Sequence, residues 1–291
     1  MRAIPPPQLT FNDVLNTCVG SISCQTLTQN INAINPQLNN AVQDFDTKAA
    51  TADLFQIQPF VGADKTVVTG QVTKAELKGL YTFHMVPAKK PARQYYDQIM
   101  MQAPLRICPF CGFGQVTTLD HYLPKAKFPL LSIFPKNLVP SCADCNKGKN
   151  AGIATSKNEQ CLHPYFDQGH FINDQWLFAE VIHTSPATIR YFVQAPSHWS
   201  ASDQARVNNH FDDFKLAKRF SIQAGDEISN LRGELDIDFQ INQQTGVEQA
   251  LLKKHAGASL QHTNSWKTAM YQALAASNWY CSGGFNLTVV V

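Results

Sequence analysis

Two C-x2-C pairs constrain this chain more than any other feature of its sequence. The segment 112–141 separates the pairs, and Gly112 and Gly114 follow the first one, where a tight knuckle needs a permissive backbone. Each pair can present two thiolates to one ion, and Zn2+ prefers four such ligands in a tetrahedron. The sequence therefore predicts a structural zinc held by Cys108, Cys111, Cys142 and Cys145. A closed four-thiolate site clamps the fold without catalysing a reaction. Redox pairs or buried free thiols are the alternative interpretation.

The other four cysteines are Cys18, Cys24, Cys161 and Cys281, and we expect all of them to be buried thiols. The first residues contain three prolines but no apolar stretch typical of a signal peptide. No apolar run approaches the roughly 18 residues that a membrane span needs. We therefore expect a cytoplasmic protein without disulfides and without membrane contact.

The pattern of apolar residues predicts an α+β protein that is mainly helical. With 291 residues, of which 44% are hydrophobic and 16% charged, the chain can bury a substantial core. Helical spacing covers 11–54, interrupted at Asn35-Pro36, and the capping-box pattern Thr73–Glu76 marks another helix start. The remaining expected elements are a helix at 92–102, short strands at 117–119 and within 134–140, a helix from 143, strands at 176–181 and 188–193, and helices at 208–220, 246–255 and 264–276.

Positive charge gathers around the cysteine pairs. The net charge is only +2, but residues 86–160 contain ten Lys or Arg and four Asp or Glu. This segment therefore has a surplus of six positive charges, and the rest of the chain is net negative. A phosphate backbone would need positive charge at this place.

The segment between the cysteine pairs contains every residue type needed to hydrolyse a phosphodiester. His121 offers a general base, Asp120 and Asn146 offer oxygen ligands for a hard divalent ion, and lysines can hold a phosphate backbone. Such a reaction needs an activated water and a Lewis acid near the leaving oxygen. A structural role for each of these residues taken singly is the competing interpretation.

At these residues the sequence resembles the HNH endonucleases, whose core is the ββα-metal fold. Four phrases in order carry the resemblance: C-P-F-C-G from 108, L-D-H-Y-L-P-K from 119, K-N-L-V-P-S-C from 136 and C-N-K-G-K from 145. The resemblance implies a small zinc-clamped ββα-metal core inserted in a mainly α-helical protein. We accordingly expect a helical region at 1–104, the nuclease core at 105–170, and two strands followed by helices at 171–291.

By this resemblance, His121 is the general base and Asn137 orients it and braces the loop. Asp120 and Asn146 bind a catalytic Mg2+ or Mn2+. Asn146 departs from the name-giving pattern, which has His there, and an oxygen ligand favours a hard ion over Zn2+. Lys125, Lys147 and Lys149 are the expected nucleic-acid contacts. The implied substrate is DNA, with RNA left open.

The segments 93–97, 163–167 and 281–285 resemble those of bacterial HNH proteins from antiphage defence loci, which often lie beside an ATPase. This resemblance implies a defence role and an ATPase partner. His163 and Asp167 either support the site or belong to a packed turn, and we favour the turn. The rival function is a catalytically inactive, zinc-stabilised module that binds nucleic acid or an ATPase partner.

Overall fold

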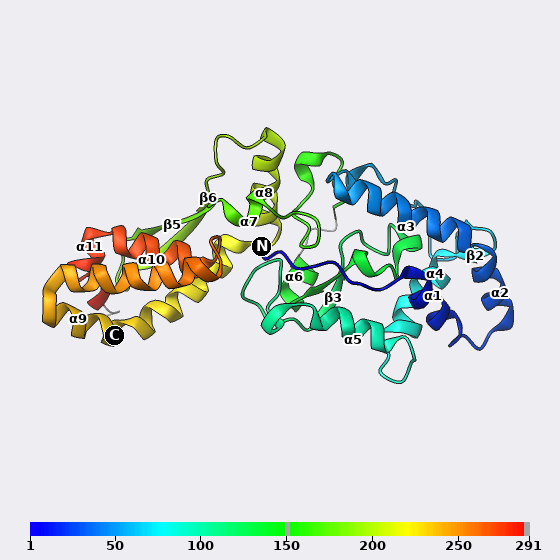
Figure 1. Ribbon diagram of the computed structural model, residues 1–291, viewed down its shortest axis with the longest axis horizontal. Coiled ribbons are helices and arrows are strands. Elements are labelled where there is room, and N and C mark those ends of the chain that lie inside the picture. Colours follow the sequence, from blue (N-terminus) through cyan, green and yellow to red (C-terminus); the bar gives the residue numbers. More distant parts are fainter. Residues whose placement is uncertain (149–151, 288–291) are drawn as a thin grey trace. The chain divides into compact units, whose positions relative to one another are not determined.

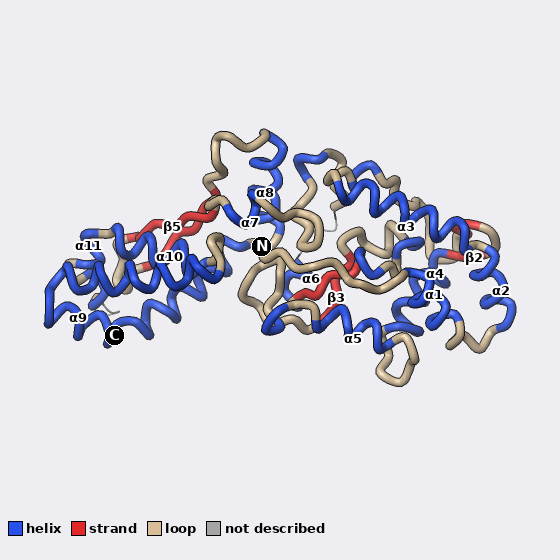
Figure 2. Tube along the Cα trace, viewed as in Figure 1, coloured by secondary structure: helices blue, strands red, loops and turns tan. Residues whose placement is uncertain are grey.

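The computed structural model describes residues 1–148 and 152–287, and the chain divides into two compact units. One unit contains Arg2–Asp167, and the other contains Met1 and the chain from Gln168 onward. The expected N-terminal helical region and the expected core therefore share a unit, whereas the C-terminal helices form a separate one. Each unit combines helices with two-stranded antiparallel sheets, so the α+β class is confirmed (Figure 2). No helix in the described parts is long and apolar enough to cross a membrane.

The unit Arg2–Asp167 begins with three helices rather than the expected two. The first predicted helix is interrupted after Val19, where both the amide and the hydroxyl of Ser21 bond to the Cys18 carbonyl. A serine that satisfies the helix carbonyls locally ends the helix, and apolar spacing does not reveal this. Asn35-Pro36 opens the next helix, as expected. The helices are α1 (Phe11–Val19), α2 (Gln25–Ala33) and α3 (Asn35–Ala50).

The rest of this unit contains the expected helices and hairpin strands, together with β1, β2 and a π-helical turn that the sequence did not predict. The capping box is present, because the Thr73 hydroxyl accepts from the Glu76 amide and the Glu76 carboxylate accepts from the Thr73 amide. After α4 the helix continues as a π-helical turn, a rare conformation that is often found at functional sites. The elements are β1 (Val67–Thr69), β2 (Val72–Thr73), α4 (Lys74–Gly79), the π-helical turn (Leu80–Met85), α5 (Arg93–Met101), β3 (Thr118–His121), β4 (Leu138–Ser141) and α6 (Ala143–Gly148).

The strands β3 and β4 form a hairpin whose register runs from Thr118 opposite Ser141 to His121 opposite Leu138. Helix α6 follows β4 directly and packs on β3. Two antiparallel strands and a helix therefore follow one another in this segment. The connection between the strands, residues 122–137, is compact and mostly buried. This hairpin, its connection and α6 contain all of the predicted catalytic residues.

The second unit is a helical layer on the β5–β6 hairpin. Helix α9 contains a break at Asn242 and Gln243, and Figure 1 shows its yellow and orange halves running back along each other. Gly246 permits this close return, because a Cβ there would collide with the carbonyl of Asp238. The elements are α7 (His170–Asn173), β5 (Leu177–Ile182), β6 (Thr188–Val193), α8 (Ala201–Asp213), α9 (Leu216–Gln261), α10 (Trp266–Ala276) and α11 (Asn278–Cys281).

Candidate metal centre and active site

The four predicted cysteines meet in space. Their sulfur atoms all lie within 4.8 Å of one another, and all four side chains are buried. Four thiolates at about 2.3 Å from a tetrahedral zinc would stand about 3.8 Å apart. The Cys111 and Cys142 sulfurs are 3.9 Å apart, which fits that arrangement. The cluster could hold a metal ion such as zinc.

The backbone around the first pair forms a tight knuckle. The Gly112 amide donates to the Cys108 carbonyl at 2.8 Å, and Gly112 adopts a positive φ of 76°. The Gly114 amide donates to the Cys111 sulfur, and a Cβ on Gly114 would lie 2.8 Å from the Cys142 sulfur. The geometry therefore favours glycine at both positions: Gly112 because of its positive φ, and Gly114 because a side chain there would collide with a cysteine sulfur.

Protonation of the cluster is coupled among the four thiols. Hydrogen bonds among the sulfurs, together with burial, raise the pKa of Cys108 and Cys145. Hydrogen bonds with Cys108 and Cys145 lower the pKa of Cys111 to about 7, and hydrogen bonds with the other three thiols lower that of Cys142 strongly. Several thiolates can share a buried space only with protons or a cation between them. Metal binding would therefore release protons and couple to folding.

Of the remaining cysteines, Cys18, Cys161 and Cys281 are buried as expected, whereas Cys24 is exposed. The expectation for Cys24 was therefore wrong. Cys24 directly precedes α2, in the segment that connects α1 to α2 and interrupts the predicted helix.

His121 lies at the end of β3, and only 8% of its surface is exposed. Its Nε2 lies 2.8 Å from the backbone carbonyl of Ser132. A carbonyl can only accept, so Nε2 carries the proton and the basic lone pair resides on Nδ1. Ser132 is itself fixed, since its hydroxyl donates to the Leu77 carbonyl at 2.6 Å. The connection between the strands thus sets the tautomer of His121.

Asn137 ties this connection together and is completely buried. Its side-chain oxygen accepts from the Leu123 amide at 2.7 Å. Its side-chain nitrogen donates to the carbonyls of Leu123 at 3.0 Å and Leu131 at 3.2 Å. The amide therefore holds both ends of the connection, next to the residue whose carbonyl receives His121.

Asn146, in α6, lies against the face of β3 that carries Asp120. The Asn146 side chain donates to the Thr118 hydroxyl at 3.2 Å, and Thr118 and Asp120 alternate with Leu119 along the strand. Asp120 is nearly buried, with 6% of its surface exposed, and Asn146 is half-buried on α6. The carboxylate and amide oxygens of these two residues are the donor type that a hard divalent ion prefers.

The predicted lysines differ in their environments. Lys147 is exposed on α6, whereas Lys149 lies outside the described residues. Lys125 is half-buried, with its ammonium 4.4 Å from the centre of the Tyr81 ring. Burial, together with repulsion from Lys78, lowers the pKa of Lys125.

Sequence reasoning missed Tyr81, which comes from the π-helical turn. Its ring centre is 4.4 Å from that of His121, and the two rings are nearly perpendicular, at 74°. Burial, with smaller contributions from Tyr96 and Asp120, raises the pKa of Tyr81, so its hydroxyl stays protonated. No motif marks this tyrosine, because its closeness to the site comes from tertiary packing.

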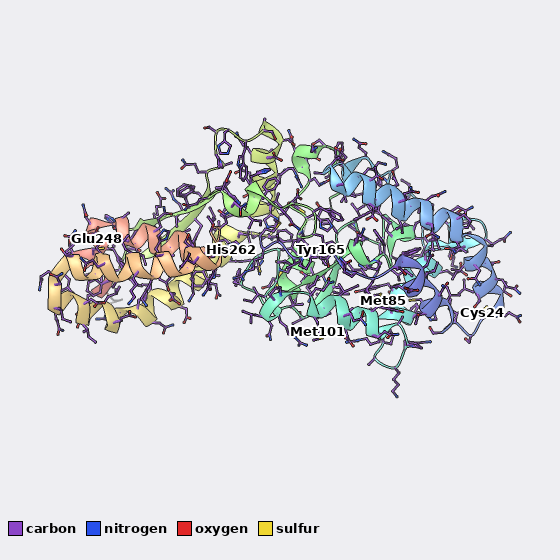
Figure 3. The ribbon with its side chains drawn as sticks, in the orientation of Figure 1. Cys24, Met85, Met101, Tyr165, Glu248 and His262 are labelled. Carbon is purple, nitrogen blue, oxygen red and sulfur yellow. The ribbon has the colours of Figure 1, made fainter. Side chains whose placement is uncertain are left out.

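The segment 161–167 is a packed turn against the hairpin, the interpretation favoured above. The Tyr165 hydroxyl, labelled in Figure 3, donates to the Leu138 carbonyl at 2.7 Å. The Tyr122 hydroxyl donates to the Cys161 carbonyl, and the His163 ring packs on Tyr122 with centres 4.1 Å apart. The Asp167 carboxylate accepts from the His163 amide and closes the turn.

Comparison with known proteins relates the chain to a phage protein. No family model matches the chain, and no solved structure matches it. Protein ea31 of Escherichia phage lambda is 31% identical over 296 residues, and the match covers 97% of this chain and 100% of that protein. At that identity over nearly the full length of both proteins, the chain belongs to the same family as the lambda phage protein ea31.

Proposed function

We propose that this protein is a metal-dependent HNH endonuclease that hydrolyses phosphodiester bonds of DNA, with RNA as the second candidate substrate. The observation that carries this proposal is the setting of His121. Its Nε2–H is bonded to the Ser132 carbonyl, and Asn137 braces the same connection. This arrangement keeps a basic nitrogen in a fixed place within a ββα unit that four cysteines can clamp.

In the proposed reaction, Nδ1 of His121 takes a proton from the attacking water. Asp120 and Asn146 would hold the divalent ion, and when bound that ion supplies charge stabilisation at the leaving 3′ oxygen. Asn137 keeps the connection, and hence the histidine, in place. Lys125, Lys147 and Lys149 would hold the nucleic-acid backbone, and the zinc of the cysteine cluster would have no chemical step.

The burial of Asp120 and His121 is the observation that favours the rival function, a non-catalytic nucleic-acid-binding or ATPase-partner module. Only 6% of the Asp120 surface and 8% of the His121 surface are exposed. A scissile phosphate can reach these two side chains only if the hairpin opens a path to them. The defence role, the ATPase partner and the cytoplasmic location rest on sequence alone and stay predictions.

The test is cleavage of plasmid DNA and of a matched RNA with Mg2+ or Mn2+. Wild type is compared with His121→Ala and with His198→Ala, the same substitution at an exposed histidine of the second unit. We expect the wild type and His198→Ala to cut and His121→Ala to lose activity. Intact nucleic acid under both metals, or equal cutting by the wild type and His121→Ala, would refute the enzyme and leave the binding module.

A further inference from the structure

We propose that Tyr81 is a positioning residue that orients His121 and, together with Lys125, forms a subsite for a nucleic-acid phosphate near the scissile bond. The orientation of His121 rests on the nuclease function proposed above, whereas the phosphate subsite can be tested by binding alone. Tyr81 belongs to no motif of the resemblance, and it lies in the π-helical turn Leu80–Met85. Met85, which ends this turn, is labelled in Figure 3.

The Tyr81 ring is firmly placed. Only 7% of its surface is exposed, and its hydroxyl lies 3.4 Å from the Leu119 carbonyl in β3. The Tyr96 ring from α5 packs at a centre distance of 6.4 Å. π-helical turns are rare and occur frequently at functional sites. Here the Tyr81 side chain is directed at the end of β3.

The segment from α4 through the π-helical turn acts on His121 directly through Tyr81 and indirectly through Ser132. The Tyr81 ring packs nearly perpendicular to the imidazole, with centres 4.4 Å apart. The Leu77 carbonyl accepts from the Ser132 hydroxyl, and the Ser132 carbonyl receives Nε2 of His121. One contact fixes the ring plane and the other fixes the proton. Both are needed to keep Nδ1 directed to one place.

Lys125 follows His121 closely in the chain and places its ammonium 4.4 Å from the Tyr81 ring centre. Among the described residues no carboxylate lies within ion-pair distance of Lys125. Its nearby charge is Lys78, whose own ammonium is paired with Asp64 at 2.8 Å. The ring face stabilises a half-buried cation without neutralising it. An uncompensated ammonium beside the proposed general base is suited to a phosphate oxygen.

The test measures the salt dependence of DNA affinity and the cleavage rate separately. Affinity for a labelled duplex is measured in the His121→Ala background without a divalent metal, so that cutting does not interfere, with added Lys125→Gln, Lys125→Arg or Lys253→Gln. Lys253 is exposed in the second unit and controls for net charge. Loss of one phosphate contact lowers the slope of log affinity against log salt by about 0.9. We expect this loss for Lys125→Gln, and not for Lys125→Arg or Lys253→Gln.

Cleavage by Tyr81→Phe and Tyr81→Leu tests the orientation of His121. We expect Tyr81→Phe to retain the rate, since it keeps the ring, and Tyr81→Leu to lose roughly 100-fold in kcat, as misplaced catalytic groups do. If Tyr81→Leu does not fold, Tyr81→Met, which fills a similar space without an aromatic ring, replaces it with the same expected loss. An unchanged salt slope in Lys125→Gln overturns the subsite, and Tyr81→Leu cutting within twofold of wild type overturns the orienting role. A wild type that binds with the expected slopes but never cuts refutes the nuclease alone.

Discussion

The substitution Asn137→Ala should destabilise the unit Arg2–Asp167 more than any single surface change. The alanine removes one acceptor and two donors, which leaves the Leu123 amide and the carbonyls of Leu123 and Leu131 without the partner they have in the wild type. The site is completely buried, so water cannot replace the lost bonds. A buried group without its partner costs about 1–3 kcal/mol, and carbonyls relax more easily than amides, so we expect a loss of about 3–5 kcal/mol. That is a large share of the roughly 5–15 kcal/mol of a typical domain.

The assay is equilibrium unfolding in urea, followed by far-ultraviolet circular dichroism. Because the chain has two units, the transition is fitted for each unit separately. Asn40→Ala, at an exposed position of α3, is the matched control and should change stability by less than about 0.5 kcal/mol. A loss below about 1 kcal/mol for Asn137→Ala would show that the connection between β3 and β4 does not depend on this amide.

Three further predictions concern metal, charge and backbone. Metal analysis should find about one zinc per chain, and Cys142→Ser should lose it and lower the melting temperature; an unchanged melting temperature after complete metal removal would contradict a structural zinc. The hydrogen bond from the Trp199 indole holds the pKa of Asp174 below its ordinary value of 3.8, so its contribution to stability is present above that value and is lost as the pH falls through the lower folded pKa. Trp199→Phe should therefore raise the pKa of Asp174 in a carboxyl NMR titration, and an unmoved midpoint would count against the bond. Gly246→Ala should destabilise the second unit by about 1–3 kcal/mol, because its Cβ would meet the Asp238 carbonyl, whereas exposed Gly257→Ala should not.

Local signals were sufficient to predict the elements that contain the site. The cysteine spacing indicated a cluster that could bind a metal, and the four sulfurs do meet. The capping box at Thr73 and the helix after Cys142 begin where expected, and both strands of the hairpin overlap their expected positions, shifted by a few residues. The capping box and the apolar spacing depend on residues within about one helical turn or one strand of one another, and each C-x2-C pair is equally local, although the two pairs are thirty residues apart.

Tertiary features could not be predicted in the same way. His121 is bonded to a backbone carbonyl, and because every residue has one, no sequence motif can indicate this partner. Tyr81 reaches the site from a π-helical turn in a distant segment, and nothing in the spacing of apolar residues distinguishes that turn from an α-helix. The end of α1 was also not predicted. The Ser21 hydroxyl donates to the Cys18 carbonyl and so takes the place of a backbone hydrogen bond of the helix, which the spacing of apolar residues does not reveal.

The most direct test of the central claim is the single-turnover rate of DNA cleavage with Mg2+ or Mn2+, compared between wild type and His121→Ala at equal zinc content. A general base contributes about 10²–10⁴-fold to such a rate, and we expect His121→Ala to be slower by a factor in that range while His198→Ala keeps the wild-type rate. Equal rates for wild type and His121→Ala, or no cleavage by a folded, zinc-loaded wild type with either metal, would contradict the assignment of His121 as the base of an HNH nuclease.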